Sequence, residues 1–185
     1  MVLWVAIVGL FVWVSFEFLL RSPGEARRLA DAADTGHSTQ VLVASFLVAL
    51  GINTVLASAR LALAPLGIRW AGCALLVCGL ALRAWSMAIL GRRYSRGLQV
   101  TKSQALVVEG PYRIIRHPGY AGSLLVWIGF ALGVGSWAGA ILVGLVLGAA
   151  YFYRIAAEER LLRTVFGPAY QTYQQRTWRL IPGLF

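Results

Sequence analysis

Residues 110–122, Gly-Pro-Tyr-Arg-Ile-Ile-Arg-His-Pro-Gly-Tyr-Ala-Gly, hold one of the two histidines of the chain and several other groups able to do chemistry. Gly110-Pro111 is typical of a turn, and the proline after His117 predicts that a helix begins there. A helix N-terminus attracts anions through its free N–H groups, and Arg113 and Arg116 add full positive charges beside it. The stretch is therefore a candidate site for a charged ligand, although a basic loop that only orients a membrane protein would carry similar residues.

A second group of polar residues lies at 154–159. Arg154 and Glu158 are four residues apart, so a helix places their side chains on one face. Glu159 is turned by about 100° from Glu158 and is expected to face the basic loop. Its replacement by alanine should therefore weaken ligand binding less than replacement of Glu158 or His117. A salt-bridged helix end would explain these residues without any activity. The functional interpretation is a polar pocket, covered by residues 104–109 and lined by Tyr112, His117, Tyr120, Arg154 and Glu158.

Composition determines the class of protein that must position these groups. Hydrophobic residues make up 59% of the chain and charged residues 13%, with a mean hydropathy of +0.71, which indicates an integral membrane protein. The net charge of +10 lies in short segments between apolar runs, so it indicates membrane topology and not nucleic-acid binding. Two histidines, together with Cys73 and Cys78 on different sides of one apolar run, form no metal-binding pattern, so no metal is expected.

The elements expected from this pattern are five transmembrane helices in an all-α chain, at residues 2–20, 41–59, 70–90, 118–134 and 137–156. A polar connector, residues 21–40, joins the first two spans, and His37 within it is expected to be a solvated loop residue. Arg83 lies inside the third span, where it either faces the bundle or reaches outward to the interface. Glycines recur at four-residue spacing in the last two spans, which favours close approach of their backbones.

The basic residues predict the orientation of the chain. With the N-terminus outside, most of them fall in residues 21–40, 91–116 and the amphipathic C-terminal tail, which are then all cytoplasmic. Residues 60–69 lie on the opposite side. The long connector, the start of the fourth span, the end of the fifth and the tail therefore meet at the cytoplasmic face of the membrane.

Several motifs in residues 90–185 resemble, in order and spacing, the isoprenylcysteine carboxyl methyltransferase family and the related phospholipid methyltransferases. The motifs are Gln-Ala-Leu-Val-Val-Glu-Gly-Pro-Tyr at 104–112, Arg-His-Pro-Gly-Tyr-Ala-Gly at 116–122, Arg154 with Glu158-Glu159, and Phe-Gly-Pro-Ala-Tyr at 166–170 followed by Tyr173 and Ile181-Pro182. The resemblance implies S-adenosylmethionine bound between the cytoplasmic ends of the last spans, the connecting loop and the tail. The chain has no Gly-x-Gly-x-x-Gly motif after a strand, in agreement with such a site.

The resemblance also implies the site residues. Glu158 would hold the ammonium group of the cofactor, and Arg154 would face the carboxylate of the acceptor. Gln104 stands where the eukaryotic enzymes carry histidine, so a contact there would run through its backbone. The residues implied to line the cofactor site are Gln104, Ala105, Leu106, Val107, Tyr112, His117, Pro118, Gly119, Tyr120 and Glu158. The chain is then a single membrane domain, with three spans in residues 1–90 and a methyltransferase core in residues 91–185.

Methyl transfer from a sulfonium requires alignment of acceptor, methyl and sulfur in a dry site. A carboxylate acceptor needs no base, whereas an amine must first lose a proton, which Glu158, Glu159 or His117 could accept. The expected substrate is an isoprenylcysteine-type carboxylate or another lipophilic acceptor that enters from the lipid of the cell membrane. Three alternatives stay open at this point: a phospholipid amine or thiol methyltransferase, a sterol-reductase-like enzyme that uses NADPH, and a non-enzymatic membrane protein.

Overall fold

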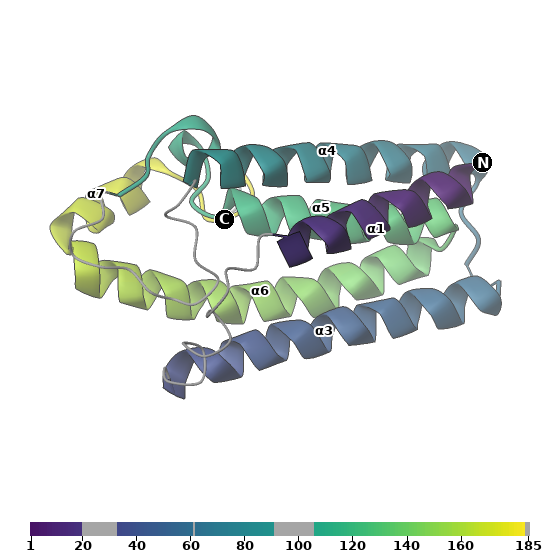
Figure 1. Ribbon diagram of the computed structural model, residues 1–185, viewed down its shortest axis with the longest axis horizontal. Helices are drawn as coiled ribbons and strands as arrows, with labels where there is room; N and C mark the ends of the chain where they lie inside the picture. The colour runs from purple at the N-terminus through teal and green to yellow at the C-terminus, as the bar shows by residue number, and fades with distance from the viewer. Residues whose placement is uncertain (20–32, 61, 91–105, 184–185) are drawn as a thin grey trace.

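The computed structural model describes residues 1–19, 33–60, 62–90 and 106–183 as an all-helical arrangement (Figure 1). The elements are α1 (Val2–Leu19), α3 (Ala33–Ser58), α4 (Leu66–Leu90), the 3-10 helix η2 (Gly110–Arg113), α5 (Pro118–Val134), α6 (Trp137–Phe166) and α7 (Pro168–Arg176). Helices α3, α6, α5 and α4 lie side by side in that order, and α1 packs across α5 and α4. The short α7 lies at the end of the bundle where α6 ends and α5 begins.

The helices present apolar side chains outward. Residues His37–Ser58 of α3 and the whole of α4 and α6 are long and apolar enough to cross a membrane, and Val2–Ser15 and α5 are shorter apolar helices. Large side chains such as Phe11, Leu47 and Leu145 are 66–70% exposed, which suits contact with lipid and not with water. The chain is therefore a helical integral membrane protein.

Three helices extend beyond the expected spans, and the first of them is α4, which begins at Leu66 instead of residue 70. Helix α3 begins at Ala33, so Ser38 and the exposed His37 lie on a helix and not in a loop as the polar composition indicated. Helix α6 continues without a break to Phe166, where Gly167 ends it with φ 53°. At 1.5 Å per residue its 30 residues span about 45 Å, more than the roughly 30 Å of a hydrocarbon core. The last turns of α6 can therefore reach past the lipid.

Glycines bring the backbones of α4 and α5 into contact. A Cβ atom added at Gly79 would lie 2.6 Å from the carbonyl oxygen of Gly122, and one at Gly129 would lie 2.6 Å from that of Gly72. The glycine spacing had indicated close contact within the hairpin of α5 and α6, but Gly148 has no neighbour within 4 Å. The close seam is thus between α4 and α5, and it sets the position of the N-terminus of α5.

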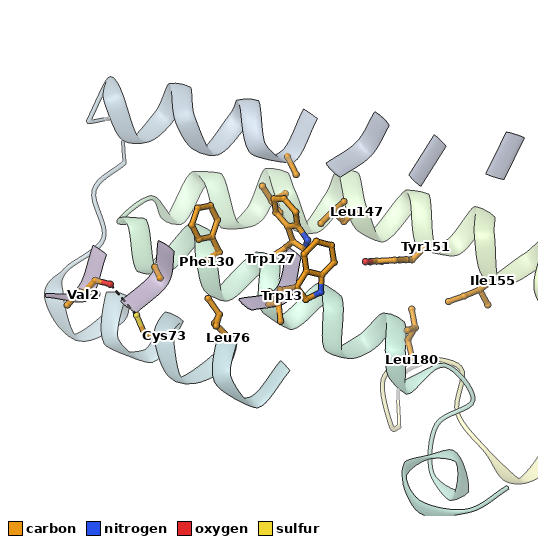
Figure 2. Packing of buried hydrophobic residues seen from close by; sticks show 14 residues of the cluster. Val2, Trp13, Cys73, Leu76, Trp127, Phe130, Leu147, Tyr151, Ile155 and Leu180 are labelled. Atoms are coloured by element: carbon orange, nitrogen blue, oxygen red, sulfur yellow. Dashed lines mark hydrogen bonds between the residues drawn. The ribbon is translucent and has the colours of Figure 1, made fainter. Parts of the chain in front are cut away.

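An aromatic cluster joins the N-terminal helices to the C-terminal ones (Figure 2). The ring centroids of Trp13 and Trp127 are 5.6 Å apart, and Phe46 of α3 stacks on Trp127 at 5.4 Å. Trp13 also donates a hydrogen bond to the Ser123 hydroxyl at 3.3 Å. Tyr151 of α6 contacts Phe46 edge-on, so four helices share one aromatic contact network.

Arg83 faces the inside of the bundle. Its side chain is 8% exposed, forms an ion pair with Glu17 of α1, and donates a hydrogen bond of 2.7 Å to the carbonyl oxygen of Gly119. These contacts decide between the two orientations that the sequence left open. Arg83 therefore joins α1 and α4 to the first turn of α5, the turn that follows His117.

Candidate functional site

The N-terminus of α5 is held by the end of the chain. His117 is the N-cap residue, Pro118 is the first helical residue, and the backbone N–H of Arg116 donates to the carbonyl oxygen of Trp178 at 2.8 Å. A second backbone bond of 3.2 Å runs from His117 to Arg179. The expected helix start at His117-Pro118 is confirmed, and the tail that pairs with it brings further charged residues to the same place.

Glu159 is buried at the centre of a cluster of cations. The side chain is 2% exposed, and its Oε1 atom lies 2.9 Å from Nε of Arg116. Its Oε2 atom lies 3.0 Å from Arg179 and 3.5 Å from Arg163. Gln174 of α7 donates to the same oxygen at 3.2 Å. The expectation that Glu159 faces the basic connector is confirmed by Arg116, and the carboxylate also ties α6, α7 and the tail together.

Glu158 lies in different surroundings. Its side chain is 28% exposed, and its Oε2 atom accepts a hydrogen bond of 2.9 Å from the Tyr120 hydroxyl. The same oxygen lies 3.9 Å from Nδ1 of His117, whose Nε2 atom is 3.4 Å from Glu159. The His117 and Tyr120 rings stack with centroids 5.8 Å apart. The Glu159 carboxylate is thus paired with three arginines. The Glu158 carboxylate instead lies beside the rings of His117 and Tyr120 and is partly accessible to solvent.

Arg154 lies one helical turn before Glu158 and is 4% exposed. Its Nε atom approaches the Tyr120 hydroxyl at 3.4 Å, so Tyr120 connects the arginine to Glu158. Its Nη1 atom donates to the hydroxyls of Ser38 at 2.6 Å and Thr39 at 3.1 Å, both on α3. A guanidinium and a carboxylate therefore lie side by side, an arrangement able to hold an anionic group and a cationic group next to each other.

Helix α7 supports the segment before α5. The Tyr173 hydroxyl donates a 2.7 Å hydrogen bond to the carbonyl oxygen of Tyr112 in η2. Burial raises the pKa of Tyr173 to about 12, so this hydroxyl stays protonated and able to donate at neutral pH. Tyr170 is 1% exposed, and burial, with the nearby Glu159, raises its pKa as well. Among the described residues no hydrogen-bond partner reaches the Tyr170 hydroxyl.

Of the residues expected from the sequence, Tyr112 lies in η2, where its carbonyl oxygen accepts the bond from Tyr173. The structure brings His117, Tyr120, Arg154 and Glu158 together, and Pro118 and Gly119 form the first turn of α5 beside them. Leu106 and Val107 are half-buried, whereas Gln104 and Ala105 lie outside the described residues.

Sequence reasoning missed Ser38, Thr39, Gln174 and Arg179. The two hydroxyls belonged to a stretch that looked like a polar connector, and the other two residues gain their contacts from the pairing of the tail. The adjacent hydroxyls directly before an apolar run were the one available signal for the first pair.

Comparisons with known proteins find related methyltransferases. A family model described as phospholipid methyltransferase matches residues 68–169. A probable protein-S-isoprenylcysteine O-methyltransferase of Oryza sativa subsp. indica is 26% identical over 182 residues, which are 97% of this chain and 95% of that protein. The protein-S-isoprenylcysteine O-methyltransferase of Schizosaccharomyces pombe is 31% identical over 109 residues, 58% of this chain and 46% of the yeast protein.

A solved structure has a similar fold. It is that of a eukaryotic intramembrane Ras methyltransferase, isoprenylcysteine carboxyl methyltransferase, and it superimposes with a TM-score of 0.61 at 22% identity. The match covers 81% of this chain and 53% of the other, so this chain spans about half the length of that protein. At this identity the likeness shows the fold alone.

Proposed function

The chain belongs to the phospholipid methyltransferase family and is a membrane methyltransferase, and on this premise we propose that it methylates the carboxylate of a lipophilic, isoprenylcysteine-type acceptor with S-adenosylmethionine. The names of its relatives support this acceptor class. The contrast between Glu158 and Glu159 is the observation that supports the site: three arginines surround one carboxylate, and the other is bordered by a tyrosine and a histidine and partly accessible.

The residues at this site fit the cofactor. Glu158 offers a partly exposed carboxylate to the ammonium group of S-adenosylmethionine, and the stacked rings of His117 and Tyr120 offer faces to its cationic and adenosine parts. The buried hydroxyl of Tyr170, for which the described residues supply no hydrogen-bond partner, is a further donor for a polar ligand. The remaining residues proposed for the cofactor site are Gln104, Ala105, Leu106, Val107, Tyr112, Pro118 and Gly119.

For this reaction the side chains of the site need only bind the cofactor and the acceptor and align them with each other. When bound, the cofactor supplies an electrophilic methyl group, and its transfer to a carboxylate oxygen leaves S-adenosylhomocysteine and no proton to remove. Arg154 receives the acceptor carboxylate and orients one oxygen toward the cofactor site, next to Glu158. The burial of Arg154 and His117 keeps water away from these groups, which strengthens each charged contact.

The function is tested with purified protein in detergent. S-adenosylhomocysteine should raise the melting temperature in a concentration-dependent way, since a ligand at about 100 times its Kd stabilises a protein by about 2.7 kcal/mol. NADPH should not raise it. With radiolabelled cofactor and N-acetyl-S-farnesylcysteine, the label should enter the lipid product and be released by mild alkali, as a methyl ester requires. Protection by NADPH alone would indicate a reductase, and an alkali-stable labelled phospholipid would indicate an amine acceptor.

We further propose a multi-pass topology in the cell membrane, with five spans and with the site and the C-terminus in the cytoplasm. In this proposal the chain is one membrane domain, residues 1–90 supplying three spans and residues 91–185 the methyltransferase core. The excess of basic residues near the site supports this orientation.

The orientation predicts which single cysteines an impermeant maleimide can reach in intact cells. In a background lacking Cys73 and Cys78, a cysteine at the exposed Ala59 should react, and one at the exposed Gln171 should react only after the cells are opened. The two positions lie at opposite ends of the bundle and outside the site. Reaction of the 171 variant in intact cells would contradict the proposed orientation.

A further inference from the structure

We infer that Ser38 and Thr39, on α3, are positioning residues that hold Arg154 for an anionic acceptor, an inference that rests on the proposed function. The Nη1 atom of Arg154 donates to both hydroxyls, at 2.6 Å and 3.1 Å. Ser38 is 1% exposed and Arg154 is 4% exposed, so these bonds form away from bulk solvent, where hydrogen bonds to a charged group are strongest.

The two hydroxyls determine the direction of a flexible side chain. An arginine has several rotatable bonds, and its planar guanidinium recognises a carboxylate well only in one orientation. The Ser38 and Thr39 hydroxyls of α3 accept hydrogen bonds from Nη1. The Tyr120 hydroxyl of α5 lies 3.4 Å from Nε. Contacts on two edges from two different helices fix the plane of the guanidinium beside Glu158, where small misplacements of a reacting group are costly.

The contacts described for Arg154 suit the recognition of a planar anion. Ser38, Thr39 and Tyr120 meet the guanidinium through hydroxyl oxygens, at Nη1 and at Nε. A guanidinium held in one plane can bind a carboxylate through two parallel hydrogen bonds. The acceptor class that suits this arrangement is a carboxylate.

The inference extends the acceptor site to a part of the chain that the family model does not match. That match covers residues 68–169, whereas α3 ends at Ser58. Helix α3 packs directly against α6 along the bundle, which brings its first turns to Arg154 (Figure 1). Selectivity for the acceptor would thus depend on an N-terminal helix as well as on the core of the family.

The test compares acceptor kinetics and cofactor binding in variants of the full chain. The double variant Ser38→Ala/Thr39→Val should raise the KM for N-acetyl-S-farnesylcysteine at least about tenfold, with S-adenosylhomocysteine affinity within about twofold of the wild type. Arg154→Lys should behave in the same direction, because the ammonium keeps the charge and loses the planar fork. Ser38→Thr and Thr39→Ser keep a hydroxyl and should each retain most of the wild-type KM.

Ser45→Ala is the matched control, because Ser45 is a buried serine of the same helix whose hydroxyl bonds to the Leu42 carbonyl of α3 itself. It should change neither constant. An unchanged acceptor KM in the double variant would overturn the inference, and so would an equal loss of cofactor affinity, which would indicate a general structural role. Failure of the proposed function would appear instead in the wild-type protein, as the absence of an alkali-labile methyl ester, and would overturn the inference with it.

Discussion

Replacing Glu159 with glutamine is expected to destabilise the protein by about 3–5 kcal/mol, the cost of removing one partner from a buried ion pair. Glu159 is 1% exposed and within 3.0 Å of both Arg116 and Arg179. Glutamine preserves the shape of the side chain but removes the negative charge that faces the buried guanidinium of Arg116. The tail and α7 reach α6 through this carboxylate, so their attachment should loosen first.

The measurement is thermal melting of the purified variant without ligand, in the same detergent as the wild type. A cost of this size corresponds to a decrease of roughly 10 °C for a chain of this length. Glu158→Gln is the matched control: it removes the same charge from the adjacent residue, whose side chain is 28% exposed, and should melt within about 2 °C of the wild type. Equal melting of the two variants would show that the cation cluster contributes little to stability.

Glu158→Gln is expected to weaken the binding of S-adenosylhomocysteine strongly. If Glu158 holds the ammonium of the cofactor, losing the charge removes about 1.5–3 kcal/mol, so the affinity for S-adenosylhomocysteine should fall roughly ten- to hundredfold. Glutamine can still accept the hydrogen bond from Tyr120, which separates the loss of charge from the loss of that contact. Isothermal titration measures this affinity directly.

Arg160→Gln provides the comparison for the titration, since Arg160 is exposed on the same helix and its Nε atom bonds only to the neighbouring Ala156 carbonyl among the described contacts. Its affinity for S-adenosylhomocysteine should equal that of the wild type. Wild-type affinity in Glu158→Gln would remove Glu158 from the proposed cofactor site, whatever the melting temperature of the variant.

These expectations go beyond those from the sequence, which expects Glu159 to matter less than Glu158 for cofactor binding and does not predict its role in stability. Helical geometry correctly predicts that the side chains of Glu158 and Glu159 point in different directions and that Glu159 faces the loop that contains Arg116. It does not reveal that the tail pairs with residues 114–117 and adds Arg179. This pairing joins segments more than sixty residues apart, as the backbone bonds from Arg116 to Trp178 and from His117 to Arg179 show, and no local pattern predicts it. Glu159 therefore appears peripheral in the sequence and central in the structure.

Local sequence signals predict where helices begin and end better than they predict which helices contact each other. The helix start at Pro118, the tight turn at Gly135 and the break at Gly167 each follow from residues with restricted or unusual backbone angles. The glycine spacing indicates a close helix contact, but the helix that supplies the opposite glycines is α4 and not α6. The beginning of α3 was missed because polar residues such as Ser38 look like loop in composition, although tertiary contacts satisfy them.

The ion pair between Arg83 and Glu17 has a consequence for biogenesis. During synthesis α1 emerges before α4, so the acid is made long before the arginine that it meets. An arginine at the centre of a helix costs about 2.5–3.5 kcal/mol on insertion. Arg83 lies about two turns from the end of α4, where the cost is smaller, and a carboxylate on an inserted neighbour lowers it further. Entry of α4 into the bilayer should thus depend on α1 having remained beside the insertion site. The first helix, although outside the residues matched by the family model, would in this way assist the assembly of the core.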